Sequence, residues 1–574
     1  MEHNTKTYTT DVLIVGGGLG GAIMAQKLHT IKPDVKITIM EKGYFGYTGQ
    51  TTKAGHGMCI MSPEAGDEIY AMCQEQVELN PYGTYLNDQD YLFEYQKEQY
   101  TYIQELERMG GKFSHNPDGT LHHHHEFEGK KISAVQIDVD FMTPFCKNVM
   151  AGGAQILERT YFTDLLTKDG KVVGAVGFHL DTTDFVIVRA KEVVLATNEF
   201  NPSCRDMFYA PATGYAAAYE AGAQLRNVEH LTEWDLVYRN TGNFLYGVHW
   251  VVCNSKGENL FRKYNSQSLE ELEVQLIRGM AKELEMGNGP LVADFTLLPK
   301  VNEGADGFYH GIEMKQRMEL DQFIGRFQHV DPTNPKPEVS VSYRVSIRSL
   351  RIDVEGKTTV PHLWGLGQMT TAGSAHGSWV HGDGLGVAAK TGLMTAKAMA
   401  KYIDQTELSE VDEAQVEFFR KRIYESEEYK GEYRPDHVIR YISRLIKKPE
   451  YSFNKTEETM TELIAELNEI REQYKDMIHL PKVNGHYLAK AIELRTMIDM
   501  LEIMFLVFKT RKESRGCFNR LDYPERDDRN WLKWVLVDNK SEDGKPHIFT
   551  ERIPIERYPF KPEGWQEIVM NAAN

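Results

Sequence analysis

The stretch DVLIVGGGLGGAIMAQKLHTIKPDVKITIME, residues 11–41, decides the fold class. Its first five residues form a short β-rich run that ends at glycine, as a buried parallel strand does. A GxGxxG pattern follows, made of Gly16, Gly18 and Gly21. A segment with helical spacing, a second strand and Glu41 complete the unit. This order predicts a Rossmann-type βαβ unit that binds a dinucleotide.

Each part of this unit has a physical role. Gly16 makes the tight turn, Gly18 lets a diphosphate approach the backbone, and Gly21 lets the helix pack closely on the strand. The diphosphate is expected at the helix N-terminus, where free N–H groups and the helix dipole favour negative charge. Glu41 is expected to accept hydrogen bonds from the adenosine ribose. NAD and FAD share this unit, so it does not distinguish them.

Length and charge restrict the class of protein. The chain has 574 residues, which predicts two to four domains. With 65 Lys and Arg against 83 Asp and Glu, the net charge is −18, and no basic tract stands out. Nucleic acid is therefore not an expected partner, because phosphate binding needs clustered positive charge.

The six cysteines are scattered, and no two of them form CxxC. This spacing argues against a zinc ribbon or an iron–sulfur cluster carried by this chain, and we predict no metal site. The N-terminus has no apolar signal core, and no apolar run approaches the ~20 residues of a transmembrane helix. We therefore expect a soluble cytoplasmic protein.

Further nucleotide-binding elements lie far along the chain. EVVLATNEF (192–200) reads as a strand that ends in a small polar turn, after a predicted hairpin at 170–178. VPHLWGLGQM (360–369) reads as another strand, and HGSWVHGDGLGVAAKTG (376–392) leads from it into a small-residue helix. One Rossmann-like domain thus appears in discontinuous pieces. FAD proteins are built in this way, because their long cofactor needs a second glycine-rich helix start near the flavin.

At this point the chain resembles the flavoprotein subunits of fumarate reductase, succinate dehydrogenase, L-aspartate oxidase and adenylylsulfate reductase. The resemblance covers nearly the whole length. GYTGQTTKAGHGM (46–58) stands where that family has its flavin-contacting turn, and TGYAAAYEAGAQLRNVEH (213–230) resembles its helix before the substrate region. RLDYPERDDRNWLK (520–533) closely resembles a C-terminal signature of the family.

The resemblance implies FAD as the cofactor. Succinate dehydrogenases attach it through a histidine in the turn after the second strand, but here that place is near Gln50 and the nearest histidine is His56. We therefore expect a noncovalent flavin. Besides Gly16, Gly18, Gly21 and Glu41, the cofactor-binding residues expected from the resemblance are Lys42, Thr51, Thr52, Gly55, Ala196, Thr197, Gly367, Gly384 and Gly386.

The expected substrate is a small anion. Fumarate enzymes carry a His-Gly-Ala-Asn-Arg run whose arginine binds a carboxylate, whereas this chain has HGSWVHGDG (376–384) without arginine. In the resembled fold this loop passes beside the isoalloxazine, so His376 is predicted as a catalytic group and His381 as a substrate-binding one. The alternative for both is a neutral histidine that caps turn amides.

Three further residues are predicted at the active site. Arg278 falls at the family's active-site arginine, where it would clamp an anion or, with a carboxylate relay, donate a proton. The alternative is a surface arginine paired with glutamate along its helix. Arg348 belongs to a basic cluster before the second nucleotide strand and is predicted to bind substrate. His230 falls in a family region that contributes catalytic groups.

The expected fold is α/β: a Rossmann-like FAD-binding domain assembled from discontinuous segments, an α+β capping domain and a C-terminal helical domain. The predicted bounds are 1–240 with 350–405 for FAD binding, 241–349 for capping and 406–513 for the helices. Residues 514–574 form a tail that packs on the body. Apolar residues at helical spacing predict an antiparallel helical hairpin over 460–470 and 487–508. The run His122–His125 reads as a hairpin tip without a role.

The sequence leaves several functions open. One is a flavoenzyme that transfers hydride at flavin N5 to or from a small anionic substrate and exchanges electrons with an iron–sulfur or ferredoxin-like subunit. Sulfur-centre reduction of the adenylylsulfate type is a variant of this chemistry. The others are an oxidase of the L-aspartate oxidase type and a non-catalytic FAD-binding subunit. A homo- or hetero-oligomer is compatible with each of them.

Overall fold

A computed structural model describes the chain from residue 3 to residue 572, apart from residues 53–58, 62–68, 80–83, 98, 122, 125–133, 138–139, 203–208, 231, 240–250, 265–275, 277–278, 298–333, 346, 373–382, 453, 482–483, 517 and 542–543.

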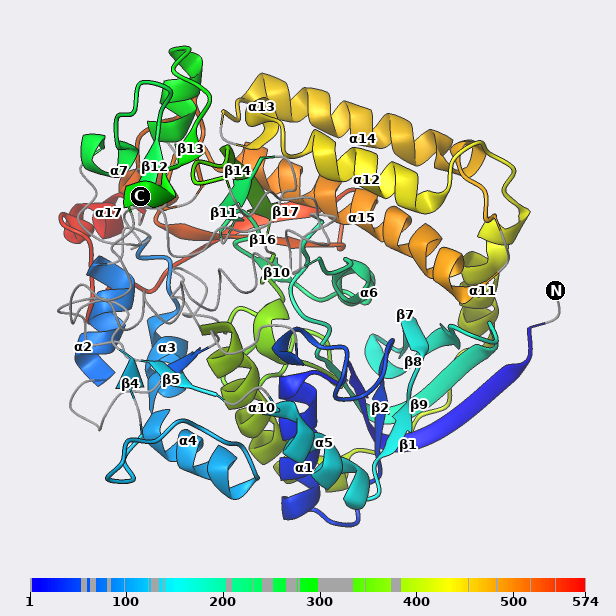
Figure 1. Ribbon diagram of the computed structural model, residues 1–574. Coiled ribbons are helices and arrows are strands. Elements are labelled where there is room, and N and C mark those ends of the chain that lie inside the picture. Colours follow the sequence, from blue (N-terminus) through cyan, green and yellow to red (C-terminus); the bar gives the residue numbers. More distant parts are fainter. Residues whose placement is uncertain are drawn as a thin grey trace.

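A seven-stranded sheet built from sequence-distant segments carries the nucleotide-binding half of the molecule (Figure 1). Its strands run in the order β6 (Gln155–Leu157), β2 (Ile37–Met40), β1 (Thr5–Val15), β9 (Phe185–Leu195), β8 (Lys171–His179) and β7 (Thr160–Lys168), with β15 (Leu363–Gly365) also paired to β9. The first four strands and β15 are parallel, and β7 and β8 add an antiparallel hairpin. The predicted assembly from discontinuous segments is confirmed.

Helices cover both faces of this sheet because its central strands alternate their side chains between two cores. Val12 and Ile14 of β1 belong to the same hydrophobic cluster as residues of α1 (Leu19–Ile31), α5 (Met142–Ala151) and α10 (Asp383–Tyr402). Leu13 and Val15 instead belong to a cluster with residues of α6 (Thr213–Glu220) and of the C-terminal helices. β1 extends further toward the N-terminus than the sequence predicts, because it pairs with β9 from Thr5 onward.

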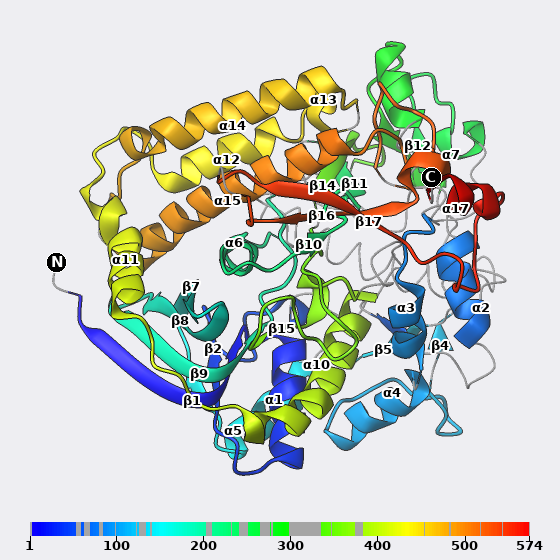
Figure 2. The ribbon, with the colours of Figure 1, turned by 180° about the vertical axis from the view of Figure 1, so that it is seen from behind.

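The C-terminal helices form a layer along the opposite edge of the molecule in Figures 1 and 2. They are α11 (Glu413–Tyr424), α12 (Pro435–Leu445), α13 (Pro449–Ser452), α14 (Glu457–Met477) and α15 (Gly485–Thr510). The apolar residues predicted at helical spacing on α15 are buried: Leu488, Ile492, Met497, Leu501, Met504, Phe505 and Phe508 are at most 3% exposed. α14 and α15 pack on each other, as the predicted hairpin requires.

The chain after α15 returns to the body of the molecule. β16 (Lys533–Asp538) pairs with β10 (Leu225–Arg226) on one side and with β17 (His547–Arg552) on the other. The indole of Trp534 donates to the Leu86 carbonyl at 2.6 Å, which ties this segment to the N-terminal half. The short helices α16 (Asp528–Trp531) and α17 (Trp565–Ala572) flank it.

The remaining elements lie around residues 59–145 and 232–345. The first group contains β3 (Cys59–Met61), α2 (Ile69–Gln74), a π-helix (Glu75–Leu79), α3 (Gln89–Gln96), α4 (Gln99–Arg108), β4 (His123–His124) and β5 (Ala134–Gln136). The second contains β11 (Thr232–Tyr238), β12 (Val252–Cys253), α7 (Leu260–Lys263), β13 (Val292–Ala293) and β14 (Val339–Val345). His123 and His124 pair with β5, whereas His122 and His125 lie outside the described residues.

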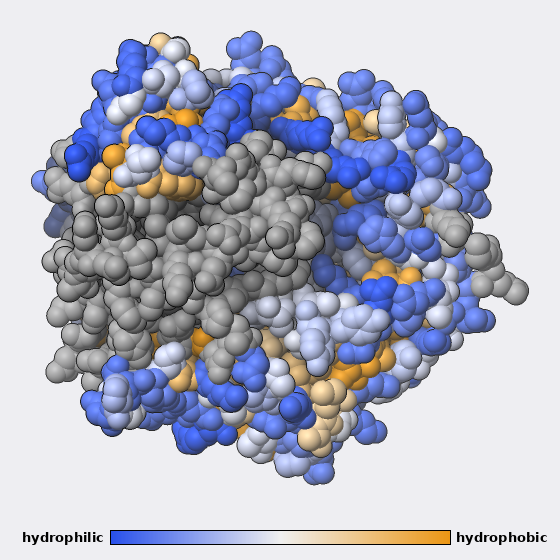
Figure 3. Space-filling model, in the orientation of Figure 1, coloured by the Kyte–Doolittle hydropathy of each residue, from blue (hydrophilic) through white to orange (hydrophobic). Residues whose placement is uncertain are grey.

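Hydrophilic side chains dominate the described part of the face shown in Figure 3, above all over the long C-terminal helices. Among the residues that the structure describes, no helix is long and apolar enough to cross a membrane.

Candidate functional site

The glycine turn after β1 borders an open space. Gly16 has φ +106°, and a Cβ there would lie 2.4 Å from the Ala196 carbonyl oxygen, so only glycine fits. Gly18 begins α1 with φ −72° and ψ −172°, which any residue adopts. A Cβ on Gly18 would meet no described atom within 4 Å. The turn therefore closes against the protein at Gly16 and opens to a cavity at Gly18.

α1 approaches its neighbours closely through glycines. A Cβ on Gly21 would lie 2.3 Å from the Gly16 carbonyl oxygen, and one on Gly392 would lie 2.7 Å from the Gly20 carbonyl oxygen. The first contact packs α1 on the turn, and the second lets α10 cross α1. Gly18 and Gly384 both line one cavity, so the N-termini of α1 and α10 meet there.

Glu41 fixes the turn with its buried carboxylate. Oε2 accepts the Gly17 N–H at 2.8 Å, and Oε1 accepts the Gly43 N–H at 2.8 Å and the Thr48 hydroxyl at 3.1 Å. A carboxylate has about four lone-pair sites, so these donors leave one for a ribose hydroxyl. In the described structure, Glu41 mainly stabilises the turn.

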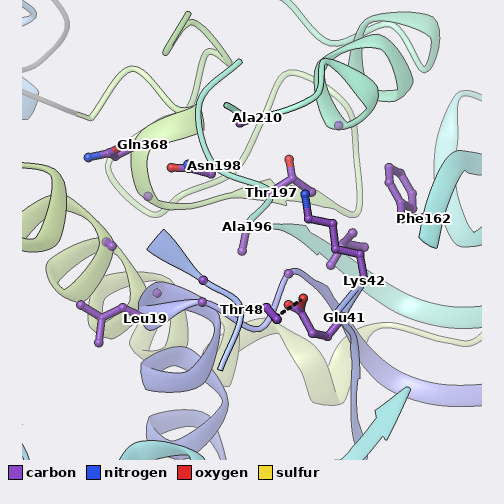
Figure 4. Close-up of a pocket in the computed structure, with 18 of the residues that line it drawn as sticks. Leu19, Glu41, Lys42, Thr48, Phe162, Ala196, Thr197, Asn198, Ala210 and Gln368 are labelled. Carbon is purple, nitrogen blue, oxygen red and sulfur yellow. Dashed lines mark hydrogen bonds between the residues drawn. The ribbon is translucent and has the colours of Figure 1, made fainter. Parts of the chain in front are cut away.

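The cavity runs from this turn to the start of α10 and encloses about 1350 Å³ of empty space, part of it open to solvent. Lys42, Thr197 and Phe162 line it (Figure 4). Asn198 and Gln368 also line it and lie on the opposite side of the view from Phe162 (Figure 4). Residues of β2, β7 and α10 and of the segment after β9 thereby line one cavity.

The residues that the sequence predicts for the cofactor fall into three groups. The cavity lining includes Gly16, Gly18, Glu41, Lys42, Thr51, Ala196, Thr197, Gly367 and Gly384. It does not include Gly21, which packs α1, nor Thr52, whose hydroxyl donates to the Gly49 carbonyl at 2.6 Å, nor Gly386, which is buried in α10. Gly55 lies outside the described residues.

Arg348, a predicted substrate-binding residue, lies in a buried ion pair. Its Nε is 2.7 Å from Oε2 of Glu199, and both side chains are at most 2% exposed. Phe200 and Ile347 bond each other through both of their backbone N–H groups, so the loop after β9 is paired with the segment that carries Arg348. Arg348 is not among the described residues that line the cavity.

His230, a predicted catalytic residue, is buried away from the cavity lining. It is 3% exposed, with its Nε2 3.5 Å from Oε1 of Glu229 and its ring 6.2 Å from that of Phe518. Arg278, His376 and His381, the other predicted substrate-side residues, lie outside the described residues.

Several cavity residues were not predicted from the sequence. They are Tyr161 and Phe162 of β7, Asn198 after β9, Tyr209, Thr213 and Gln368. Asn198 has φ +73°, a conformation that asparagine tolerates better than most residues. Because Asn198 directly follows a predicted strand, the sequence could have indicated it as a cavity residue. Tyr161 and Phe162 could not be found in this way, because the place of β7 depends on the order of the strands in the sheet.

The residues present fit a flavin dinucleotide. α1 begins at Gly18 without a side-chain cap from any described residue and with no acid in its first turn, so its N–H groups are available to a diphosphate. Lys42 adds a positive charge to the lining. Among the described residues, no group of three His, Cys, Asp or Glu is arranged to hold a metal. Sheet, turn and cavity together define a dinucleotide-binding protein of the Rossmann type.

Comparison with known proteins identifies the kind of dinucleotide-binding protein. Residues 11–284 match the FAD binding domain family, and residues 448–565 match the family described as fumarate reductase flavoprotein C-term. The fumarate reductase flavoprotein subunit of Haemophilus influenzae is 23% identical over 580 residues, which cover 95% of this chain and 94% of that protein.

Solved structures agree on the fold. A mutant FrdA chain of E. coli quinol fumarate reductase superposes with a TM-score of 0.81 at 20% identity, over 96% of this chain and 98% of that one. Adenylylsulfate reductase from Archaeoglobus fulgidus superposes with a TM-score of 0.77 at 19% identity, over 97% and 98%. The chain belongs to the fumarate reductase/succinate dehydrogenase flavoprotein family, and it is an FAD-dependent oxidoreductase.

Proposed function

We propose that the chain binds FAD without a covalent bond and exchanges a hydride between flavin N5 and a small anionic substrate. The observation that carries this proposal is the single cavity that joins the glycine turn of α1 to the N-terminus of α10. When bound, FAD supplies two-electron exchange with substrate carbon or sulfur at its ring.

The direction of the cofactor follows from the two ends of the cavity. The diphosphate is placed at Gly18, and the adenosine toward Glu41, Lys42 and Tyr161, because a ribose binds at the end of the second strand of a Rossmann unit. Asn198, Gln368 and Gly384 would then hold the flavin end. The helix dipole of α10 favours negative charge at this end, where electrons collect on reduction.

The substrate is held by groups outside the described residues. Arg278 is proposed to clamp the anion by a charge-assisted bond, and His376 and His381 are proposed to contact the substrate. Arg348 is proposed to act on the substrate only through the loop after β9, because its guanidinium is paired with Glu199. His230 remains a predicted active-site residue, although it is not among the described residues that line the cavity.

Electrons leave or enter through a second protein of the iron–sulfur or ferredoxin-like class, since the cysteine spacing of this chain supports no cluster of its own. The relative from Haemophilus influenzae is named a flavoprotein subunit, which supports a role within a complex. The substrate is an enoate or a sulfur nucleotide. The loop HGSWVHGDG lacks the carboxylate-binding arginine of fumarate enzymes, which argues against fumarate or succinate itself.

An anaerobic reoxidation screen tests this function. Photoreduced enzyme is mixed with enoates and with sulfur nucleotides, and the return of the oxidised flavin spectrum is followed. We expect reoxidation by one class of anion and slow reoxidation by air. Rapid reoxidation by air alone would identify an oxidase, and no reaction with either class would identify a non-catalytic subunit.

Arg278→Ala is expected to lower kcat/KM for the substrate found in this screen by about a thousandfold, because a buried anion loses its charged partner. Arg239→Ala is the matched control, since Arg239 is 59% exposed in a surface ion pair with Glu338 and should change kcat/KM little. Equal kcat/KM for Arg278→Ala and the wild type would remove Arg278 from the active site.

A further inference from the structure

A carboxylate from the C-terminal helices contacts two tyrosines of the nucleotide cavity. Glu493 on α15 is 5% exposed. Its Oε2 accepts the hydroxyl of Tyr209 at 2.8 Å, and its Oε1 accepts the hydroxyl of Tyr161 at 3.4 Å. Both tyrosines line the cavity. A residue nearly 500 positions from the glycine turn therefore touches the wall of the cofactor site.

Tyr161 belongs to the part of the cavity next to the second strand. The preceding residue, Thr160, donates its N–H to the Glu41 carbonyl oxygen at 2.9 Å. The Tyr161 hydroxyl also lies 3.0 Å from the Thr213 hydroxyl, and Thr213 is another lining residue. Burial and the Glu493 carboxylate raise the pKa of Tyr161 well above its usual value, so its hydroxyl stays protonated and able to donate.

Tyr209 is held between two contacts. On one side the next residue, Ala210, exchanges backbone hydrogen bonds with Asn201 at 3.0 and 3.1 Å, in the loop after β9. On the other side lies Glu493. Lys490, one turn earlier on α15, lies 2.5 Å from Glu493 and places its ammonium 4.9 Å from the centre of the Tyr209 ring. The buried negative charge is thereby paired within the helix.

We propose that Glu493 is a positioning residue for the adenosine half of FAD. It acts through Tyr161 and Tyr209, which it fixes as one side of the adenosine end of the cavity, and it ties that end to α15. A mobile wall costs affinity because the side chains must be ordered on binding, so a carboxylate that orders them beforehand tightens binding. The effect is confined to ligands that contain adenosine.

This inference rests on FAD as the cofactor and not on the substrate proposed above. The experiment therefore uses binding and not turnover. The Kd of FAD is obtained by dilution of the holoenzyme, with the fluorescence of released flavin as the signal. ADP, which has the adenosine diphosphate half alone, is then titrated against holoenzyme in saturating FAD until half of the flavin is displaced.

The variants are Glu493→Gln and Tyr209→Phe, with Glu502→Gln as the control. Glu502 lies on the same helix and pairs with Arg471 of α14 at 2.7 Å, so its variant loses a similar ion pair away from the cavity lining. We expect Glu493→Gln and Tyr209→Phe to raise the Kd of FAD by about tenfold, because the freed side chains must then be ordered when FAD binds.

The half-displacing ADP concentration should stay at the wild-type value in both variants. In saturating FAD it depends on the ratio of the Kd of ADP to the Kd of FAD, and both values should rise by the same factor. Glu502→Gln should change neither quantity. An unchanged Kd for Glu493→Gln and Tyr209→Phe would overturn the proposal. A lower half-displacing ADP concentration in Glu493→Gln or Tyr209→Phe would also overturn it, because the lost contacts would then lie at the flavin end. An equal rise in the Kd of FAD for Glu502→Gln would overturn it as well, because the effect would then come from general helix packing.

Discussion

Gly18→Asp is expected to leave the chain folded and to abolish FAD binding. Gly18 occupies the N-cap of α1 with extended backbone angles, and a Cβ there meets no described atom within 4 Å. Aspartate is among the preferred N-cap residues, so the substitution should stabilise the protein without FAD by a few tenths of a kcal/mol. The new carboxylate, however, would stand where the diphosphate is proposed to bind.

Repulsion between these charges should raise the Kd of FAD at least about a hundredfold, since like charges ~4 Å apart near a protein surface cost several kcal/mol. The control is Gly18→Asn, which has nearly the same size and is also a good N-cap but carries no charge. Equilibrium titration with FAD and thermal unfolding without FAD measure the two effects. Tight FAD binding by Gly18→Asp would contradict the proposed place of the diphosphate.

Arg511→Ala is expected to cause the largest loss of stability. The Arg511 side chain is fully buried, with its Nε 2.6 Å from Glu229, its Nη1 2.7 Å from Glu513 and further donations to the carbonyls of Trp531 and Lys533 at 2.9 Å. Removing it takes the arginine partner from the buried Glu229, while Glu513 keeps its pair with Arg515. The loss of Arg511 from this buried network costs about 3–5 kcal/mol of unfolding free energy. Urea unfolding followed by circular dichroism measures this loss.

The loss from Arg511→Ala should also depend on pH. Burial already raises the pKa of Glu229 in the wild type, and removal of Arg511 raises it further. A carboxyl whose folded pKa is raised destabilises the fold as pH rises through its unfolded pKa, so the variant should be closer to the wild type at pH 5 than at pH 8. Arg552→Ala, in an exposed pair with Glu556, is the control. A loss below about 1 kcal/mol would contradict a structural role for this network.

The sequence predicted the parts of the fold that local patterns encode. The GxGxxG turn, the acid at the end of the second strand and the small-residue helix start before Gly384 can each be recognised within a few residues. The burial of α15 is visible for the same reason, because apolar residues recur along its whole length. Its two ends pack in different clusters, with Leu488 and Ile492 in one and Leu501 in another.

The rest depends on which distant segments meet. Tyr161 lines the cavity because β7 lies beside the end of β2, and Glu493 reaches Tyr161 because α15 packs behind α6 and β7. Within its own sequence, Glu493 is one of several charged residues on a largely apolar helix, and nothing there sets it apart. Arg348 was predicted from its charge alone, but the Glu199 carboxylate that engages it lies about 150 residues earlier and has no pattern that marks it as a partner.

The flavin content of the purified wild-type protein tests the central claim most directly. After acid precipitation, the supernatant should contain one FAD per chain, and the precipitated protein should have the unmodified mass of 65.7 kDa. A colourless protein that takes up no FAD, or a chain whose mass is increased by a bound flavin, would contradict an FAD held without a covalent bond in the cavity between α1 and α10.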